Sequence, residues 1–201
     1  MIRVFVGTHE MHKDAEKALE YSIQKNTSDS VNVTFIRPGW ETLPTGFSSH
    51  RYLIPELCNY KGFAIYLDVD MLVLGDLSEL WNYQRSGKWC VTMKRGKHNM
   101  IRDEVSVIDC SAFKDLPKET KLKTPKGKTL AKHKIGKRYL PIIPDEWNAR
   151  STDEYPNVKL IHFTNMRAQP WKPDPKVNYK PYHKESADLF FQYLEEANNE
   201  L

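Results

Sequence analysis

Apolar residues recur along this chain in two patterns, one typical of buried strands and one typical of amphipathic helices. Residues 2–6 and 31–36 are short runs rich in strand-forming side chains. Between them, residues 14–25 carry apolar side chains at helical spacing, with charged residues on the other face. A strand, a helix and a second strand in succession predict an α/β fold with parallel strands.

The later part of the chain continues the alternation. Residues 63–67 are five apolar residues in a row, too few for a helix, and they predict a strand buried on both faces. Residues 186–201 have the spacing of an amphipathic helix that packs on the domain. Further strands are predicted in three segments: 88–93, 105–113 and 158–164.

Two carboxylates interrupt the central apolar sequence. Asp68 and Asp70 follow the third predicted strand directly, and apolar residues resume after them. Residues two apart in extended chain point to the same side, so these carboxylates can converge while Val69 points away. Their mutual repulsion and desolvation are costly, and a divalent cation removes both costs. The alternative is a strand end at which the aspartates cap the next turn.

The sequence around these aspartates resembles a known enzyme family. Residues 66–81, YLDVDMLVLGDLSELW, are similar to the Asp-x-Asp segment of glycosyltransferase family 8. The resemblance implies a GT-A fold, a Rossmann-like single domain over residues 1–201 with a central, mostly parallel sheet flanked by helices. It also implies a nucleotide-sugar donor (usually UDP-linked), Mn²⁺ (with Mg²⁺ as an alternative) and retention of anomeric configuration.

A second segment carries the same resemblance. Residues 162–173, HFTNMRAQPWKP, are similar to the family's His-Phe-Thr-Gly-x-x-Lys-Pro-Trp motif, in which the histidine is a metal ligand. The resemblance therefore implies that Asp68, Asp70 and His162 hold the metal. Asn165 replaces the motif's glycine and Gln169 its lysine, so the positive charge expected near the diphosphate would come from Arg167 or Lys172.

The resemblance also implies residues that bind the donor. These are Thr8 in a Gly-Thr turn after the first strand, Arg51 ahead of the metal motif, Val69 between the aspartates, and Asn165, Arg167 and Lys172. A guanidinium such as that of Arg51 suits diphosphate or sugar oxygens. Residues 102–104, Arg-Asp-Glu, stand where the family has an Asn-Ser-Gly turn, and Asp103 could accept sugar hydroxyls there. The family's Asp-Gln motif is not found.

Composition adds limits to this interpretation. The chain has 201 residues and a net charge of +4, which suits an anionic ligand but is too small by itself to indicate nucleic acid. Residues 118–138 contain nine Lys or Arg residues and predict a solvated, mobile loop. The alternatives for that segment are an anionic acceptor site, a membrane-surface contact or nucleic acid.

The cysteines and the apolar runs bear on location. Three widely spaced cysteines suggest a reduced compartment, and no apolar run approaches the length of a membrane span. A cytoplasmic protein is therefore expected, although its acceptor could be membrane-bound.

Together these features predict a metal-dependent retaining glycosyltransferase. It would move a hexose from a UDP-sugar to a hydroxyl of a glycan, glycolipid or other acceptor. Asp68, Asp70 and Arg51 would be catalytic, because the metal and the guanidinium stabilise the departing diphosphate. The alternatives are a catalytically degraded nucleotide-sugar-binding relative and a metal-dependent nucleotidyltransferase, with a nucleic-acid-binding module least favoured.

Overall fold

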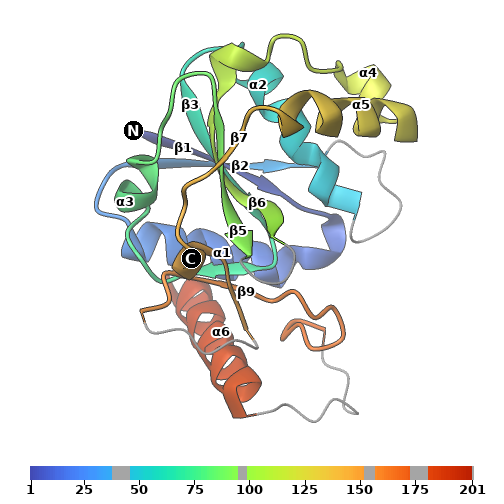
Figure 1. Cartoon of the computed structure of the whole chain (residues 1–201). Coiled ribbons are helices and arrows are strands. Elements are labelled where there is room, and N and C mark those ends of the chain that lie inside the picture. Colours follow the sequence, from blue (N-terminus) through green and yellow to red (C-terminus); the bar gives the residue numbers. More distant parts are fainter. Residues whose placement is uncertain (38–45, 95–98, 152–156, 173–180, 201) are drawn as a thin grey trace.

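The structure is a computed structural model that describes residues 1–37, 46–94, 99–151, 157–172 and 181–200. A six-stranded sheet lies at its centre, in the order β2-β1-β3-β6-β5-β7 (Figure 1). All of its strands run parallel except β6, which is antiparallel to both neighbours. The predicted α/β fold with a mostly parallel sheet is therefore confirmed. The strands are β1 (Ile2–Gly7), β2 (Val31–Ile36), β3 (Phe63–Asp68), β5 (Trp89–Lys94), β6 (Met100–Asp109) and β7 (Tyr139–Pro141).

A second, smaller sheet begins directly after β3. It contains β4 (Met71–Val73), β8 (Ala149–Arg150) and β9 (Leu160–His162), in the order β4-β9-β8. β4 follows β3 after a two-residue turn and pairs antiparallel with β9. This pairing brings the C-terminal part of the chain against the Asp-x-Asp segment.

Helices cover both faces of the central sheet (Figure 1). One face carries α1 (Lys13–Asn26), against which α6 (Pro181–Asn199) packs, so the predicted C-terminal amphipathic helix is confirmed and begins five residues earlier than expected. The other face carries α2 (Ile54–Leu57) and the Lys-rich segment. Short helices complete the fold: η1 (Glu10–His12), η2 (Gly46–Leu53), α3 (Leu77–Trp81), η3 (Cys110–Phe113) and η4 (Asp145–Asn148).

The alternation of side chains along the strands divides the core between these two faces. Along β3, Ile65 and Leu67 point into the apolar cluster under α1, whereas Ala64 and Tyr66 point into the cluster on the other face. All four residues are fully buried. The prediction of a strand buried on both faces is confirmed, and burial on both sides holds the end of β3 firmly in place.

The Lys-rich segment is not the mobile loop that its composition predicts. It forms α4 (Glu119–Leu122) and α5 (Pro125–Gly136). Thr124 caps α5 by accepting a hydrogen bond from the Gly127 backbone, and Pro125 suits the first helical turn. Leu122, Ala131 and Ile135 are fully buried in the core. Three buried apolar residues therefore anchor α4 and α5 to the core, although most residues of the segment are charged or polar.

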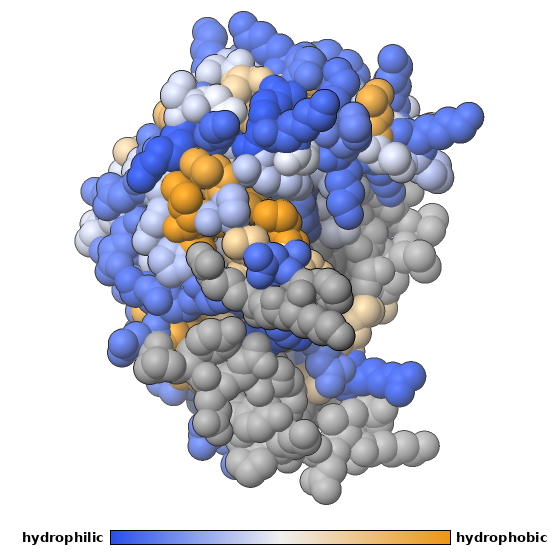
Figure 2. Space-filling model, viewed as in Figure 1, coloured by the Kyte–Doolittle hydropathy of each residue, from blue (hydrophilic) through white to orange (hydrophobic). Residues whose placement is uncertain are grey.

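The visible surface in Figure 2 is mostly hydrophilic, with apolar side chains exposed in a limited area beside β7. In the described part of the chain, no helix combines the length and the apolar character that crossing a membrane requires.

A substitution at Gly127 tests the helical packing of the Lys-rich segment. A Cβ added there would lie 1.9 Å from the Lys121 backbone oxygen. We expect Gly127→Ala to lower the free energy of unfolding by about 1–3 kcal/mol, the usual cost of overpacking. Chemical denaturation would measure the change.

Gly136→Ala is the matched control, because a Cβ at Gly136 meets nothing within 4 Å. We expect it to be neutral or stabilising. If Gly127→Ala were as well tolerated as Gly136→Ala, the segment would be a loop after all.

Candidate functional site

The site lies where β3 and its neighbour β1 end. Gly7 pairs with Asp68 in the parallel register, and the Val69 N–H donates to the Gly7 carbonyl at 3.1 Å. Val69 itself is buried in the core, so its side chain points away from the site as the alternation predicts. The carboxyl ends of parallel strands are the usual place for ligand sites in open α/β sheets.

Strand pairing brings a histidine to the two aspartates. Met71 of β4 faces His162 of β9 in the antiparallel register, and the Phe163 N–H donates to the Asp70 carbonyl at 2.8 Å. Ligand atoms of Asp68, Asp70 and His162 consequently lie within 4.8 Å of one another. We call these three residues the Asp–Asp–His group; their exposures are 5%, 7% and 4%. It could bind a metal ion.

The contacts of the Asp–Asp–His group fit a divalent cation. Asp70 Oδ1 is buried without a hydrogen-bond partner among the described residues and lies 3.3 Å from His162 Nε2. Carboxylate oxygens with one imidazole nitrogen are a donor set that suits ions such as Mn²⁺. A cation seated between them would satisfy the unpartnered oxygen and relieve the repulsion between the carboxylates.

Burial and charge shift the pKa values of this group. Burial raises the pKa of Asp68 to about 7, although the Arg51 guanidinium opposes the shift. Burial lowers the pKa of His162, but the neighbouring Asp70 carboxylate outweighs it, and the pKa rises above its ordinary value. Both groups therefore bind protons more readily than usual, and a metal ion would compete with those protons for the same atoms.

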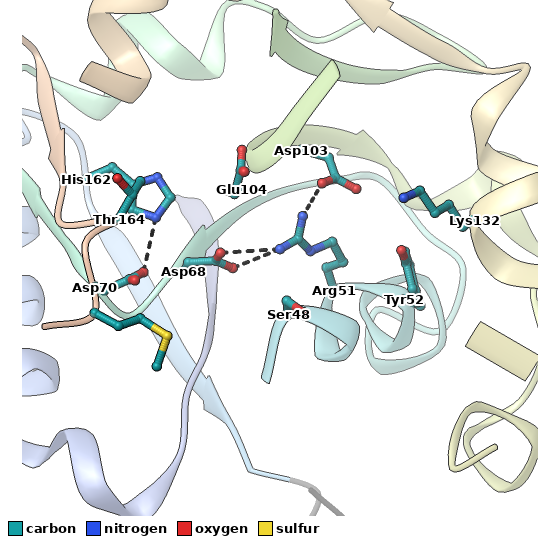
Figure 3. Close-up of a pocket in the computed structure, with 11 residues that line it drawn as sticks. Ser48, Arg51, Tyr52, Asp68, Asp70, Asp103, Glu104, Lys132, His162 and Thr164 are labelled. Atoms are coloured by element: carbon teal, nitrogen blue, oxygen red, sulfur yellow. Dashed lines mark hydrogen bonds and ion pairs between the residues drawn. The ribbon is translucent and has the colours of Figure 1, made fainter. Parts of the chain in front are cut away.

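Arg51 lies between two carboxylates rather than in open space (Figure 3). Its Nη2 donates to Asp68 Oδ1 at 3.0 Å, and its Nη1 forms a close ion pair with Asp103. The Tyr66 and Tyr139 hydroxyls donate to the same two carboxylates. Burial opposes the charge of Arg51, but Asp68 and Asp103 outweigh it and raise its pKa well above the ordinary value. Arg51 is thus a buried, permanently charged bridge.

An irregularity in β6 brings two acidic residues to the site. Val91 of β5 pairs with Ser106, but the next residue, Thr92, pairs with Arg102. The intervening residues of β6 therefore have no partner in β5, a β-bulge that redirects side chains. As a result, both Asp103 and Glu104 face the site (Figure 3).

These side chains surround a cavity of about 420 Å³, a size suited to a small ligand. Figure 3 shows the Asp–Asp–His group at one end and Lys132, extending from α5, at the other. The lining residues are Ser48, Arg51, Tyr52, Asp68, Asp70, Asp103, Glu104, Lys132, His162, Thr164 and Met166.

The structure places some predicted donor-binding residues away from this cavity. The Thr8 hydroxyl is buried and donates to Glu16 Oε1 at 2.6 Å. Asn165 and Arg167 lie on an exposed turn, where Asn165 Oδ1 accepts the Arg167 N–H at 3.2 Å. None of the three lines the cavity.

Lys172 and Gln169 lie near Asp70. Burial lowers the pKa of Lys172 although Asp70 raises it, so the two charges interact. Gln169, which stands where the family motif has lysine, donates to Asp70 Oδ2 at 3.0 Å and to the Phe163 carbonyl at 3.1 Å. A neutral amide therefore holds the second Asp70 oxygen.

Three other residues of the site were not foreseen from the sequence. Lys132 was hidden by the prediction of a mobile loop, although the apolar residues Ala131 and Ile135, four positions apart, were a sequence signal for a helix, and both are buried in the structure. Glu104 depends on the β-bulge. Asn148, whose Oδ1 lies 2.9 Å from His162 Nδ1, carries no signal except its place in the Trp-Asn segment.

In sequence, this chain has low similarity to known proteins. No family model matches the chain. A relative, Protein CDI of Arabidopsis thaliana, is 26% identical over 240 residues, which cover 98% of this chain and 88% of that protein.

Similar solved structures are glycosyltransferases of the GT-A fold. The galactosyltransferase LgtC, determined in complex with donor and acceptor sugar analogs, superposes with a TM-score of 0.69 at 12% identity over 98% of this chain and 96% of that one. GlyE of Streptococcus pneumoniae gives 0.68 at 13% identity over 99% of this chain, and WbbM gives 0.64 at 13% over 96%. This chain spans 63% of the length of GlyE and about half, 49%, of the length of WbbM.

Replacing Arg51 tests its role as a buried bridge. Arg51→Met would leave the buried Asp68 and the half-buried Asp103 without their shared cation, so we expect a loss of about 3 kcal/mol or more in the free energy of unfolding. Arg167→Met, on the exposed turn, should change it by less than about 0.5 kcal/mol.

Denaturation at several pH values would show whether unpaired carboxylate charge causes the loss of stability in Arg51→Met. Arg51 lowers the pKa of Asp68 against the effect of burial, so its removal should raise that pKa further, and proton binding should then stabilise the folded variant more than the folded wild type as the pH falls. The deficit of Arg51→Met should therefore shrink in acid. A deficit independent of pH would mean that lost packing, not unpaired charge, is responsible.

Proposed function

We propose that this protein is a metal-dependent retaining glycosyltransferase that moves a hexose from a UDP-sugar to a hydroxyl of a glycan or glycolipid. The observation that carries the proposal is the buried Asp–Asp–His group at the carboxyl ends of the central strands in a GT-A fold. The resemblance to family 8 supports the UDP-linked donor and retention. The structural similarity to LgtC, a galactosyltransferase, supports the same reaction class.

In this proposal, Asp68, Asp70 and His162 hold a divalent cation, Mn²⁺ or Mg²⁺. The bound ion supplies positive charge that stabilises the nucleoside diphosphate as it leaves the sugar. The bond from the anomeric carbon to the diphosphate oxygen breaks, and a bond to the acceptor oxygen forms on the same face. The acceptor's proton passes to the departing phosphate oxygen.

In this proposal, Arg51 acts chiefly by holding other site residues in place. Two carboxylates already engage both of its terminal nitrogens, so it holds the metal ligand Asp68 and the cavity residue Asp103 in fixed relation. Its charge adds to the positive potential at the diphosphate, the contribution expected from the sequence. Thr8 and Val69 would contact the nucleotide through their backbone carbonyls, because the side chain of each is engaged elsewhere and their N–H groups donate to Ile36 and Gly7.

The other end of the cavity suits the sugar and the acceptor. Asp103 and Glu104 present carboxylate oxygens that accept hydrogen bonds from hydroxyl groups. Lys132 faces them without an ion pair to any described carboxylate and offers a positive charge to the incoming ligand. Asn165, Arg167 and Lys172 are proposed as further donor contacts, because Met166, between the first two, lines the cavity and Lys172 interacts with Asp70.

Turnover of UDP-sugars tests this function. The protein with Mn²⁺ would be incubated with UDP-glucose, UDP-galactose and other UDP-hexoses, and released UDP would be measured. We expect at least one donor to be hydrolysed or transferred, and Asp70→Asn to lower the rate by about 100-fold or more. Asp188→Asn, an exposed substitution on α6, is the control and should leave the rate unchanged.

Three other outcomes would contradict the proposal, and each has a different meaning. Release of pyrophosphate from a nucleoside triphosphate would indicate a nucleotidyltransferase. Binding of UDP-sugars without turnover in the presence of sugar acceptors would indicate a catalytically degraded relative. Turnover that survives Asp70→Asn would remove the Asp–Asp–His group from the mechanism.

A further inference from the structure

Asn148, at the end of η4, is a fully buried side chain surrounded by polar groups. Its Oδ1 lies 2.9 Å from His162 Nδ1 and accepts from Arg102 Nη2 at 2.8 Å. Its Nδ2 donates to Thr92 Oγ1 at 2.9 Å and to Glu104 Oε2 at 3.2 Å. One amide therefore connects a residue of the Asp–Asp–His group with both β5 and the bulged part of β6.

Two charged neighbours fix which way this amide points. Arg102 can only donate hydrogen bonds, and an ionised Glu104 can only accept them. Exchanging the oxygen and nitrogen of Asn148 would set the amide N–H₂ against the guanidinium and the amide oxygen against the carboxylate. Both contacts would be repulsive, and the contact with Arg102 is buried. The carbonyl oxygen of Asn148 must therefore face Arg102, and with it His162.

The orientation of the amide determines the state of the imidazole. Because Asn148 Oδ1 is an acceptor, His162 Nδ1 must carry a proton and donate it. In the neutral ring, Nε2 then has a free lone pair. That nitrogen faces Asp70 Oδ1, the buried oxygen that has no hydrogen-bond partner among the described residues.

We propose that Asn148 is a positioning residue of the metal site: it fixes His162 as the Nδ1–H tautomer and so presents Nε2 to the cation. Arg102 and Glu104 hold the amide in the required orientation. An outer hydrogen bond of this kind commonly changes metal affinity by about 10-fold to 100-fold. The inference rests on the proposed function for the presence of the cation, whereas the tautomer itself is a property of the metal-free protein.

The tautomer can be observed directly by ¹⁵N NMR. The metal-free protein would be labelled at its seven histidines, and a His162→Gln spectrum would assign the His162 ring signals. At a pH where the ring is neutral, we expect a protonated Nδ1 and an unprotonated Nε2. In Asn148→Leu we expect the tautomers to mix, and calorimetry with Mn²⁺ should show binding about 10-fold to 100-fold weaker.

Two further variants separate positioning from stability. Asn148→Asp combined with Glu104→Gln keeps an acceptor for His162 Nδ1, and the new amide can donate to the second carboxylate oxygen, so the pair should preserve the wild-type tautomer. Thr92→Val removes a hydroxyl from the same buried network but leaves the Oδ1 contact intact. It should lower stability while leaving both the tautomer and the Mn²⁺ affinity near those of the wild type.

An Nε2–H tautomer in the wild type, or a tautomer unchanged in Asn148→Leu, would overturn the inference. A loss of Mn²⁺ affinity in Thr92→Val equal to that in Asn148→Leu would also overturn it, because general loosening would then explain both. If the wild type had the expected tautomer but bound no divalent cation, the proposed function would fail and the tautomer assignment would stand.

Discussion

The burial of several carboxylates in one place is the constraint on which this structure depends. Asp68 ends a strand that is packed on both faces, so its charge cannot move into solvent. Arg51 compensates that charge at 3.0 Å, and His162 faces Asp70 at 3.3 Å. Asp70 Oδ1 nevertheless stays buried without a hydrogen-bond partner among the described residues. A divalent cation held as proposed would satisfy that oxygen and offset the repulsion between the two aspartates.

Backbone pairing keeps these charges together. The register of β4 with β9 sets His162 beside the aspartates, and the bulge in β6 turns Asp103 and Glu104 into the same cavity. Asn148 and Arg51 then link the two sides through buried hydrogen bonds. Such networks are stable only when every member is satisfied, so the position of the Asp–Asp–His group is coupled to the positions of Asp103 and Glu104.

Local patterns predicted what depends on nearby residues. The two-residue period of extended chain predicted that Asp68 and Asp70 converge, and the five-residue apolar run predicted the strand that carries them. His162 was found through a motif, because no local pattern links residues so far apart in sequence. Glu104 and Lys132, which also line the cavity, were not predicted. The position of Glu104 depends on a shift in strand register. Lys132 lies on a helix whose few buried residues are outnumbered by lysines.

Calorimetry of UDP binding, with and without Mn²⁺, tests the central claim most directly. If the Asp–Asp–His group holds a cation that binds the diphosphate, UDP should bind the wild-type protein with Mn²⁺ present and should bind far more weakly after the metal is chelated. UDP binding that is unaffected by chelation, or absent under both conditions, would contradict a metal-dependent nucleotide site in this cavity.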